Sequence, residues 1–317
     1  MEAVRQPHMT NAVLIFNPTA GRGRASQSHI ESARKILAQA GIETTLRPTS
    51  ARGDATKLAR EAVAENRDMI IVCGGDGTIN EVVNGMAGSR VPLAVLPAGT
   101  ANILAKELGL PWNVSKAAAL IARGKHRRIA LGVVSSTASS ESTAASDEPP
   151  RYFFSVGGAG PDGAVVYSLD AGFKKKAGIL AYWYEGARQL FQYPFPRFRV
   201  NSHGREIDAT LVVVGRTKHY GGPFRITTEA DLFEDSFEVL AVTTRSPAKF
   251  LSYLPALWLG YLRRMEGIHT WKATELHCLP PADGVAYAQV DGEALGRLGV
   301  KFTIVPDALT IIVPESL

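Results

Sequence analysis

The chain has 317 residues, of which 45% are hydrophobic and 21% are charged. These proportions are typical of a globular protein with room for two domains or one large one, and they exclude a chain that is disordered throughout. The formal net charge of +5 fits attraction to nucleotide phosphates or to anionic lipid headgroups, and composition does not choose between them.

The cysteine content and the first residues bear on location. Two cysteines are too few for a disulfide framework or a zinc site, and they favour a reducing compartment. Residues 1–10 carry charges of both signs and lack the apolar run of a secretory signal. We therefore expect a cytoplasmic protein.

Residues 11–130 alternate between short β-branched runs and longer amphipathic segments. This alternation is typical of a parallel sheet covered by helices on both faces, as in a Rossmann-like α/β domain. The expected strands are 12–16, 42–46, 69–73 and 91–96, and the expected helices are 26–40, 54–65, 79–86 and 101–108. Within the second helix Ala55, Leu58, Ala59, Ala62 and Val63 share one face, which predicts that this face packs on the sheet.

Glycine-rich loops follow three of these strands. They are Asn17-Pro18-Thr19-Ala20-Gly21, Gly74-Gly75-Asp76-Gly77-Thr78-Ile79-Asn80 and Pro97-Ala98-Gly99-Thr100-Ala101-Asn102. Each loop leads into a helix, whose free amides and positive dipole end attract anions, and glycine lets the backbone approach a ligand closely. Because the carboxyl ends of parallel strands meet at one edge, we expect the three loops to form a phosphate site there.

The middle loop contains a carboxylate. Asp76 would repel a phosphate unless a cation or a sugar hydroxyl separates them, so we expect a nucleotide together with Mg²⁺. Thr78 and Glu81 have the spacing of a capping box, which predicts that the helix begins at Ile79. Taken alone, the loop also fits an ordinary strand-to-helix turn with a solvated aspartate.

The ordered set NPxxGxG, GGDGTxNExxNG and PxGTxN resembles the diacylglycerol kinase catalytic family. That family includes bacterial diacylglycerol kinases, YegS-like and BmrU-like lipid kinases, and the sphingosine and ceramide kinases. The resemblance implies ATP and Mg²⁺ as cofactors. It implies nucleotide contacts at Asn17, Pro18, Thr19, Ala20, Gly21, Thr49, Gly74, Gly75, Asp76, Gly77, Thr78, Ile79, Asn80, Gly99 and Thr100. For Thr49 the alternative is a hydroxyl that satisfies its local turn.

The second half of the chain has a different texture. After an expected strand at 128–134, residues 135–150 are small, polar and without periodicity, so we assign 131–150 to a low-complexity insertion or linker. From 151 to 317 short strands dominate, which predicts an antiparallel β-sandwich as a second domain, and the last strands are free to return to the first. The expected strands are 152–156, 198–200, 210–214, 237–243, 270–278, 285–290, 300–305 and 309–313.

The stretch GAGPDG at 158–163 fits the pattern G-x-G-x-x-G. Pro161 and Asp162 interrupt it, and no βαβ unit is expected around it, so we reject a dinucleotide site. It resembles instead a glycine turn of the family's second domain, which lines the cleft.

Two segments, 178–192 and 248–264, are unusually rich in aromatic and aliphatic residues. Neither contains the roughly 20 uninterrupted apolar residues that span a bilayer, and Pro255 breaks the second. They are either core helices or a surface that docks on a membrane and admits an acyl chain. We expect a lipid substrate at a membrane surface and no nucleic-acid partner, and a homodimer remains possible.

Residues 289–293 read Gln-Val-Asp-Gly-Glu. Alternate residues of a strand share a face, so Asp291 and Glu293 point to one place if extension persists through the turn. Phosphorylation of an alcohol needs a positioned hydroxyl and a carboxylate that receives its proton. These residues match the family's DGE motif, which implies that Glu293 is the proton acceptor and that Asp291 orients it or reaches Mg²⁺. A β-turn with solvated acids is the alternative.

Residues 231–237 resemble the family stretch ALxxDGxL, which in bacterial diacylglycerol kinases carries a structural Mg²⁺. The resemblance implies Asp235 and the carbonyls of Leu232 and Phe237 as metal ligands. The chain departs from the pattern at Asp231, in place of a small apolar residue, and at Ser236, in place of glycine. An ordinary charged hairpin is the alternative.

The sequence therefore predicts a two-domain lipid kinase that uses ATP, with diacylglycerol as the first-choice acceptor and with chemistry in the cleft near Glu293. The alternatives are an NAD kinase-like enzyme with a soluble substrate and a catalytically silent nucleotide or lipid sensor.

Overall fold

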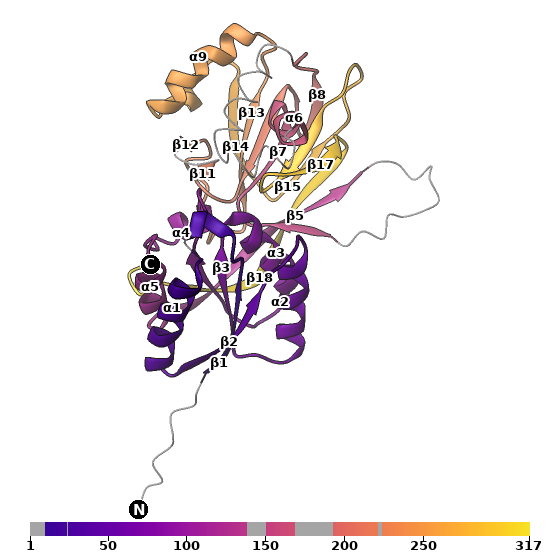
Figure 1. Cartoon of the computed structure of the whole chain (residues 1–317). Coiled ribbons are helices and arrows are strands. Elements are labelled where there is room, and N and C mark those ends of the chain that lie inside the picture. Colours follow the sequence, from indigo (N-terminus) through magenta and orange to yellow (C-terminus); the bar gives the residue numbers. More distant parts are fainter. Residues whose placement is uncertain (1–9, 24, 138–149, 169–192, 221–223) are drawn as a thin grey trace, which may run out of the picture. The chain divides into compact units, whose positions relative to one another are not determined.

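The computed structural model describes residues 10–23, 25–137, 150–168, 193–220 and 224–317 (Figure 1). Contacts divide the chain into two compact units: unit 1 runs to residue 129 and includes 307–317, and unit 2 is 130–306. Of the expected insertion, residues 131–136 form the end of strand β5 (Lys125–Ser136), and 138–149 lie outside the described residues. The apolar segment 178–192 also lies outside them.

Unit 1 is built on a parallel sheet. Its strands are β1 (Thr10–Phe16), β2 (Ile42–Pro48), β3 (Met69–Gly74) and β4 (Leu93–Pro97). They pair in the order β2-β1-β3-β4, all parallel, and Ile311 of β18 (Val300–Val313) pairs with β4. Every residue of β3 and β4 is buried, as expected for central strands of a sheet covered on both faces.

Helices cover this sheet on both faces (Figure 1). On one side α1 (Gln27–Gln39) and α5 (Val114–Ile121) join the sheet residues in one apolar cluster. On the other side α2 (Asp54–Ala64) packs closely on α3 (Asp76–Met86), and α4 (Ile103–Glu107) follows β4. The predicted face of α2 is confirmed at Ala55, Ala59 and Ala62, which are fully buried. A single 3-10 turn, Ala20–Gly23, follows the first loop.

Unit 2 is a β-sandwich. One sheet has six antiparallel strands in the order β14-β13-β10-β7-β16-β17, and in the facing layer β18, β15, β8 and β9 also pair antiparallel. In the core Phe153 stacks on Phe237, with ring centroids 5.8 Å apart, and meets Phe302 edge-on at 6.0 Å. The bounds are β6 Arg151–Phe153, β7 Val156–Gly160, β8 Phe198–Ser202, β9 Arg205–Ala209, β10 Leu211–Gly215, β13 Phe237–Val242, β14 Ile268–Ala273, β15 Glu275–Cys278, β16 Tyr287–Val290 and β17 Glu293–Arg297.

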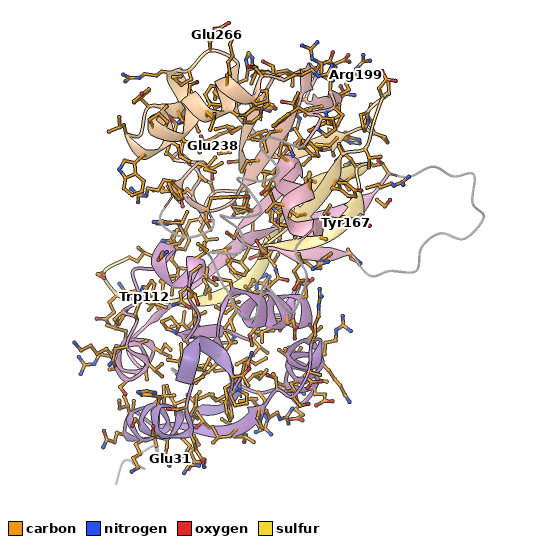
Figure 2. The ribbon with its side chains drawn as sticks, turned by 45° about the horizontal axis from the view of Figure 1, so that its top comes forward. Glu31, Trp112, Tyr167, Arg199, Glu238 and Glu266 are labelled. Atoms are coloured by element: carbon orange, nitrogen blue, oxygen red, sulfur yellow. The ribbon has the colours of Figure 1, made fainter. Side chains whose placement is uncertain are left out.

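Two helices lie on the outer side of the six-stranded sheet. Helix α9 (Pro247–Trp258) buries Tyr253 and Ala256 against β7, β10 and β13, and a 3-10 turn at Leu262–Arg264 follows it. Helix α6 (Pro161–Ser168) contacts β16, and its Tyr167 stacks on Tyr287 at 4.3 Å (Figure 2). Strand β11 (His219–Tyr220) pairs antiparallel with β12 (Phe224–Arg225). The predicted fold class, an α/β domain followed by a β-sandwich, is confirmed.

Several predicted boundaries are wrong. The expected strand 270–278 is two strands in different sheets, because the chain crosses the sandwich at Thr274. The expected strands 300–305 and 309–313 are one strand, β18, which absorbs an irregularity at Asp307 with φ of 52°. The glycine turn at 158–163 is the junction of β7 and α6.

The contact between α2 and α3 yields a stability prediction. A Cβ on Gly85 would lie 2.5 Å from the carbonyl oxygen of Thr56 and 2.7 Å from the Cβ of Ala59, whereas a Cβ on Gly77 would meet nothing within 4 Å. We expect Gly85→Ala to lower the free energy of unfolding by roughly 1–3 kcal/mol through overpacking, despite alanine's higher helix propensity. The control Gly77→Ala, in the same helix, should leave it unchanged or raised. Urea unfolding compares the two, and equal stabilities would contradict the packing.

Candidate active site

Backbone hydrogen bonds bring the three glycine-containing loops of unit 1 to one edge. The amide of Asn17 donates to the carbonyl of Cys73 (3.1 Å), which joins the end of β1 to β3. The amide of Ala98 donates to the carbonyl of Gly74 (3.0 Å), which joins the end of β3 to β4. The loops therefore begin at neighbouring strand ends. Thr49 lies beside them, because its amide donates to the carbonyl of Phe16 (2.8 Å).

The second and third loops touch through their backbones. A Cβ on Gly99 would lie 2.5 Å from the Cα of Gly75, so no side chain fits between them. Asn102 fixes this approach: its Oδ1 accepts from the amide of Gly99 (2.8 Å), and its Nδ2 donates to the carbonyl of the same residue (2.9 Å). Asn102 is fully buried with φ of 48°. Asn102 was not predicted as a site residue, although it is the last residue of the PxGTxN pattern.

The predicted start of helix α3 is wrong. The helix begins at Asp76 with Gly75 as its N-cap, and no side chain caps it. Glu81 does not close a capping box, because its Oε2 accepts from the amide of Ala55 on α2 (3.2 Å). The strand therefore enters the helix directly through Gly74 and Gly75. The amide of Ile79 is the first to bond within the helix (to Gly75, 3.0 Å), so the preceding amides are available at the loop.

Asp76 ties two helix starts together. Its Oδ1 accepts from the amide of Ile103, the first residue of α4, at 2.6 Å. Burial raises the pKa of this carboxyl, while the amides of Ile103 and Asn102 and the charge of Lys106 act in the opposite direction. In the first loop the side chain of Asn17 accepts from both the amide (3.0 Å) and the hydroxyl (2.9 Å) of Thr19. The edge is thus shaped by polar contacts, and the space beyond Gly77 is open.

In unit 2 the DGE motif forms a two-residue hairpin turn. Val290 pairs with Glu293, and the two residues between them, Asp291 and Gly292, have φ of 47° and 75°. This is the left-handed geometry for which Asp-Gly is favoured in tight hairpins. Extension does not persist through the turn, so the condition under which Asp291 and Glu293 share a face is not met.

The two carboxylates have different environments. Asp291 accepts from the amides of Phe154 (3.1 Å), Ser155 (3.1 Å) and Val156 (2.9 Å), which anchors the turn to the segment between β6 and β7. Glu293 forms an ion pair with Arg151 of β6, and both side chains are partly buried. No sequence pattern indicated Arg151, which lies 142 residues away along the chain.

Comparisons with known proteins agree with this arrangement. Residues 11–134 match the model of the diacylglycerol kinase catalytic domain, and residues 155–313 match that of the YegS C-terminal NAD kinase beta sandwich-like domain. A diacylglycerol kinase of Bacillus subtilis (strain 168) is 32% identical over 248 residues, 77% of each chain. This chain belongs to the diacylglycerol kinase catalytic family. It is therefore a kinase, in a family of lipid kinases.

Other relatives extend the match to the whole chain. A diacylglycerol kinase of Staphylococcus saprophyticus is 27% identical over 310 residues, covering 96% of each protein. A solved structure described as a diacylglycerol kinase from Bacillus anthracis str. Sterne superposes with a TM-score of 0.72 at 21% identity, covering 98% of this chain and 99% of that one. The latter shows a shared fold.

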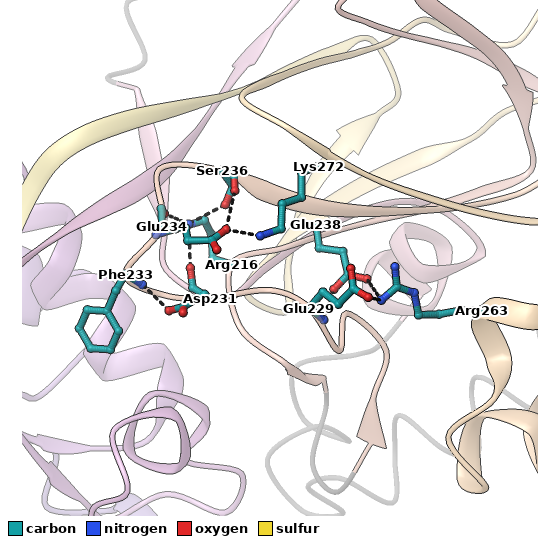
Figure 3. A network of polar contacts seen from close by, with 9 residues as sticks. All are labelled: Arg216, Glu229, Asp231, Phe233, Glu234, Ser236, Glu238, Arg263 and Lys272. Atoms are coloured by element: carbon teal, nitrogen blue, oxygen red, sulfur yellow. Dashed lines mark hydrogen bonds and ion pairs between the residues drawn. The ribbon is translucent and has the colours of Figure 1, made fainter. Parts of the chain in front are cut away.

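The resemblance to diacylglycerol kinases implied a metal at 231–237, and the residues there do not fit one. The guanidinium of Arg216, which is fully buried, donates to the carbonyls of Glu234 (2.6 Å) and Ser236 (2.7 Å) (Figure 3). It also donates to the carbonyl of Leu232 (2.6 Å). The carbonyl of Leu232 was an expected metal ligand. Asp235 is exposed, and Phe237 begins strand β13.

The backbone at Ser236 and the charge of Arg216 agree with this conclusion. Ser236 is not among the described residues with a left-handed backbone, so the turn does not require the glycine that it replaces. Burial lowers the pKa of Arg216 to about 10, with nearby carboxylates opposing, so the guanidinium stays charged at neutral pH.

Asp162, for which no role was predicted, is linked to the DGE turn through Gln289. Asp162 accepts from the Nε2 of Gln289 (2.7 Å), whose Oε1 accepts from the amide of Gly292 (2.9 Å). Gln289 is buried and so links Asp162 to the turn that carries Glu293. Burial raises the pKa of Asp162 to about 6, with the hydrogen bond from Gln289 opposing.

This raised pKa predicts a pH-dependent stability. A carboxyl whose pKa rises from 3.8 to about 6 on folding favours the folded state at low pH, and its contribution is lost as the pH rises through about 6. At pH 8 the charged group therefore costs up to about 3 kcal/mol. We expect Asp162→Asn to raise the free energy of unfolding at pH 8 by up to that amount, with a difference that shrinks towards pH 4.5. Thermal or urea unfolding across this range measures it.

The control is Asp208→Asn, at an exposed aspartate of β9. Its effect should not grow between pH 4.5 and 8. A pH-independent effect of Asp162→Asn would contradict burial of this carboxyl.

Proposed function

We propose that this kinase transfers the γ-phosphoryl group of ATP to the hydroxyl of a lipid alcohol, with diacylglycerol as the first candidate. The observation that carries the proposal is the convergence of three glycine-containing loops at the carboxyl edge of the unit 1 sheet. Open α/β sheets bind nucleotides at this edge. The relatives named diacylglycerol kinase support the choice of acceptor.

The nucleotide phosphates would bind at the start of α3. The amides of Gly77 and Thr78 precede the first bond within the helix, and the space beyond Gly77 is open. A helix N-terminus with such amides attracts anions through its dipole. The loops at 17–21 and 98–100 would complete the contacts.

Magnesium fits the nucleotide as a partner. Mg²⁺ is usually held by one or two carboxylates together with substrate phosphates and water, so Asp76 alone would suffice as the protein ligand. When bound, the ion would neutralise phosphate charge during transfer. The contact of Asp76 with the amide of Ile103 keeps its carboxylate in place at the loop.

Glu293 is the proposed proton acceptor for the lipid hydroxyl. Phosphoryl transfer has a loose transition state and needs mainly positioning, so a carboxylate held in place by its ion pair with Arg151 can serve. Asp291 acts on the same turn: its three amide contacts fix the hairpin that presents Glu293. We assign Asp291 an orienting role.

We also propose that α9 contacts the membrane surface that supplies the lipid. Leu251, Leu254 and Trp258 follow one another at helical spacing, and all three are exposed, Trp258 by 72%. Leu259, at the end of the helix, is exposed by 69%. The exposed Arg264 follows shortly after in the chain, and exposed apolar residues followed by a basic one are typical of interfacial helices.

No helix within the described part of the chain is long and apolar enough to cross a membrane.

Labelled product identifies the substrate class. The protein is incubated with γ-labelled ATP, a total lipid extract and NAD, and we expect label in a phospholipid such as phosphatidic acid. Glu293→Gln should lower kcat by at least ~10² at nearly unchanged KM for ATP, the scale of general base catalysis. Label in NADP would favour the soluble-substrate alternative, and no label in any product would favour a silent sensor.

The matched control for this experiment is Glu275→Gln. Glu275 is also a glutamate of unit 2 in an ion pair, with Lys301 at 2.7 Å, but it lies on β15 away from the DGE turn. Its kcat should equal that of the wild type. A normal kcat for Glu293→Gln would remove Glu293 from the chemistry.

Vesicle sedimentation tests the proposed membrane contact. The protein should sediment with anionic phosphatidylglycerol vesicles, and less so as salt rises, because screening weakens the basic residues. Trp258→Ala combined with Leu259→Ala should reduce the bound fraction at least about threefold, because each substitution removes apolar area that the membrane would bury. Trp112→Ala is the control, at an exposed tryptophan of unit 1 (Figure 2), and should bind normally. Equal binding of all three proteins would exclude α9 from the contact.

A further inference from the structure

Arg216 lies at the centre of the segment 227–237, which connects β12 to β13. Besides its bonds to Leu232, Glu234 and Ser236, its guanidinium donates to the carbonyls of Asp231 (3.3 Å) and Ala130 (3.1 Å). A single fully buried side chain thus gathers five backbone carbonyls. Four of them, at residues 231, 232, 234 and 236, belong to the turn itself. Figure 3 draws Arg216 with Asp231, Glu234 and Ser236.

This arrangement is that of a cation site. A turn that points several carbonyl oxygens inward concentrates partial negative charge, and such oxygens are the usual ligands of hard metal ions. Three acidic side chains, Asp231, Glu234 and Asp235, add negative charge around the same turn. Guanidinium offers five N–H donors in a fixed planar fork, so it can satisfy several carbonyls at once.

We propose that the Arg216 guanidinium is the built-in cation of this turn, and that it replaces a structural divalent metal. The inference does not depend on the nucleotide or the lipid. It gives the 231–236 turn a fixed charge that no chelator removes.

Other basic side chains stabilise the same segment from outside. Lys272 of β14 forms an ion pair with Glu234, and Arg263 forms one with Glu229 (Figure 3). Glu238, which is almost fully buried, accepts from the amide of Glu229 at 2.6 Å. Every acidic position in these contacts is therefore matched by a lysine, an arginine or an amide of the protein.

A metal ion cannot share the turn with this guanidinium. The carbonyl of Leu232 is already at 2.6 Å from Arg216 Nη2, and a divalent ion bound to the same oxygen would lie beside a buried positive charge. Repulsion between like charges is strong where water is excluded. Mg²⁺ also gives up its water reluctantly, so the exposed carboxylates of Asp231 and Asp235 would not compensate for this repulsion.

The wild-type protein gives the first test, without nucleotide. Its melting temperature should change by less than about 1 °C between EDTA and 10 mM MgCl₂, since no site at the turn is left to fill. Mn²⁺ titration followed by electron paramagnetic resonance should give the same binding for wild type and Asp235→Asn. Mg²⁺-dependent stabilisation that Asp235→Asn abolishes would overturn the proposal.

A variant of the arginine gives the second test. Arg216→Asn leaves the carbonyls without their cation, and we expect its melting temperature in EDTA to fall by at least about 5 °C. Millimolar MgCl₂ or guanidinium chloride should restore part of the loss, and Asp235→Asn in the same background should abolish the effect of Mg²⁺. The control Arg199→Asn, at an exposed arginine of β8 (Figure 2), should show neither loss nor rescue.

The two tests cover each outcome. An Arg216→Asn protein as stable as the wild type would overturn the proposal, as would a loss that neither cation restores. If this variant does not fold, the wild-type comparison of EDTA with MgCl₂ decides alone.

Discussion

Parallel pairing of β1, β3 and β4 is the constraint on which the proposed nucleotide site of unit 1 depends. Each of these strands ends at the same level, because Phe16 pairs with Cys73 and Gly74 with Pro97. A slip of one residue would turn buried side chains to the opposite face, so the register is strongly fixed in a sheet covered by helices. The loops that follow inherit this alignment. The distance between the loops is therefore set mainly by the packing of the core, and contacts among the loop residues adjust it only locally.

The sequence was sufficient for the parts of the protein that follow local rules. The alternation of strand and helix, the three loops and the sandwich could be predicted, because hydrophobic periodicity and glycine patterns report on local geometry. The start of α3 could not, because Glu81 bonds to Ala55, a residue of another helix. The split at Thr274 also follows from tertiary structure, since a strand that changes sheets keeps its hydrophobic pattern throughout.

The candidate catalytic and binding residues also divide into those that local sequence reveals and those that depend on tertiary contacts. The DGE triplet marked the turn correctly, but the backbone angles of Asp291 decide where its carboxylate goes, and they become clear only in the hairpin. Arg151, Asp162 and Arg216 reach their partners from positions far away in the sequence. No short pattern reports such contacts. A single sequence therefore reveals which residues can act, and the structure reveals which of them are already engaged with one another.

The two cation sites proposed for this chain differ in what each requires of its cation. A cation beside a transferred phosphate must arrive and leave with its nucleotide, so it is well served by a mobile ion that keeps part of its water shell. A cation that only holds a turn together does not need to dissociate. The side chain of Arg216, which lies between β10 and β11, supplies one such cation per chain. Desolvation is the main cost of burying Arg216, and its carbonyl contacts offset that cost. The departures from the family motif at Asp231 and Ser236 fit this arrangement, because the backbone oxygens of the turn face a guanidinium.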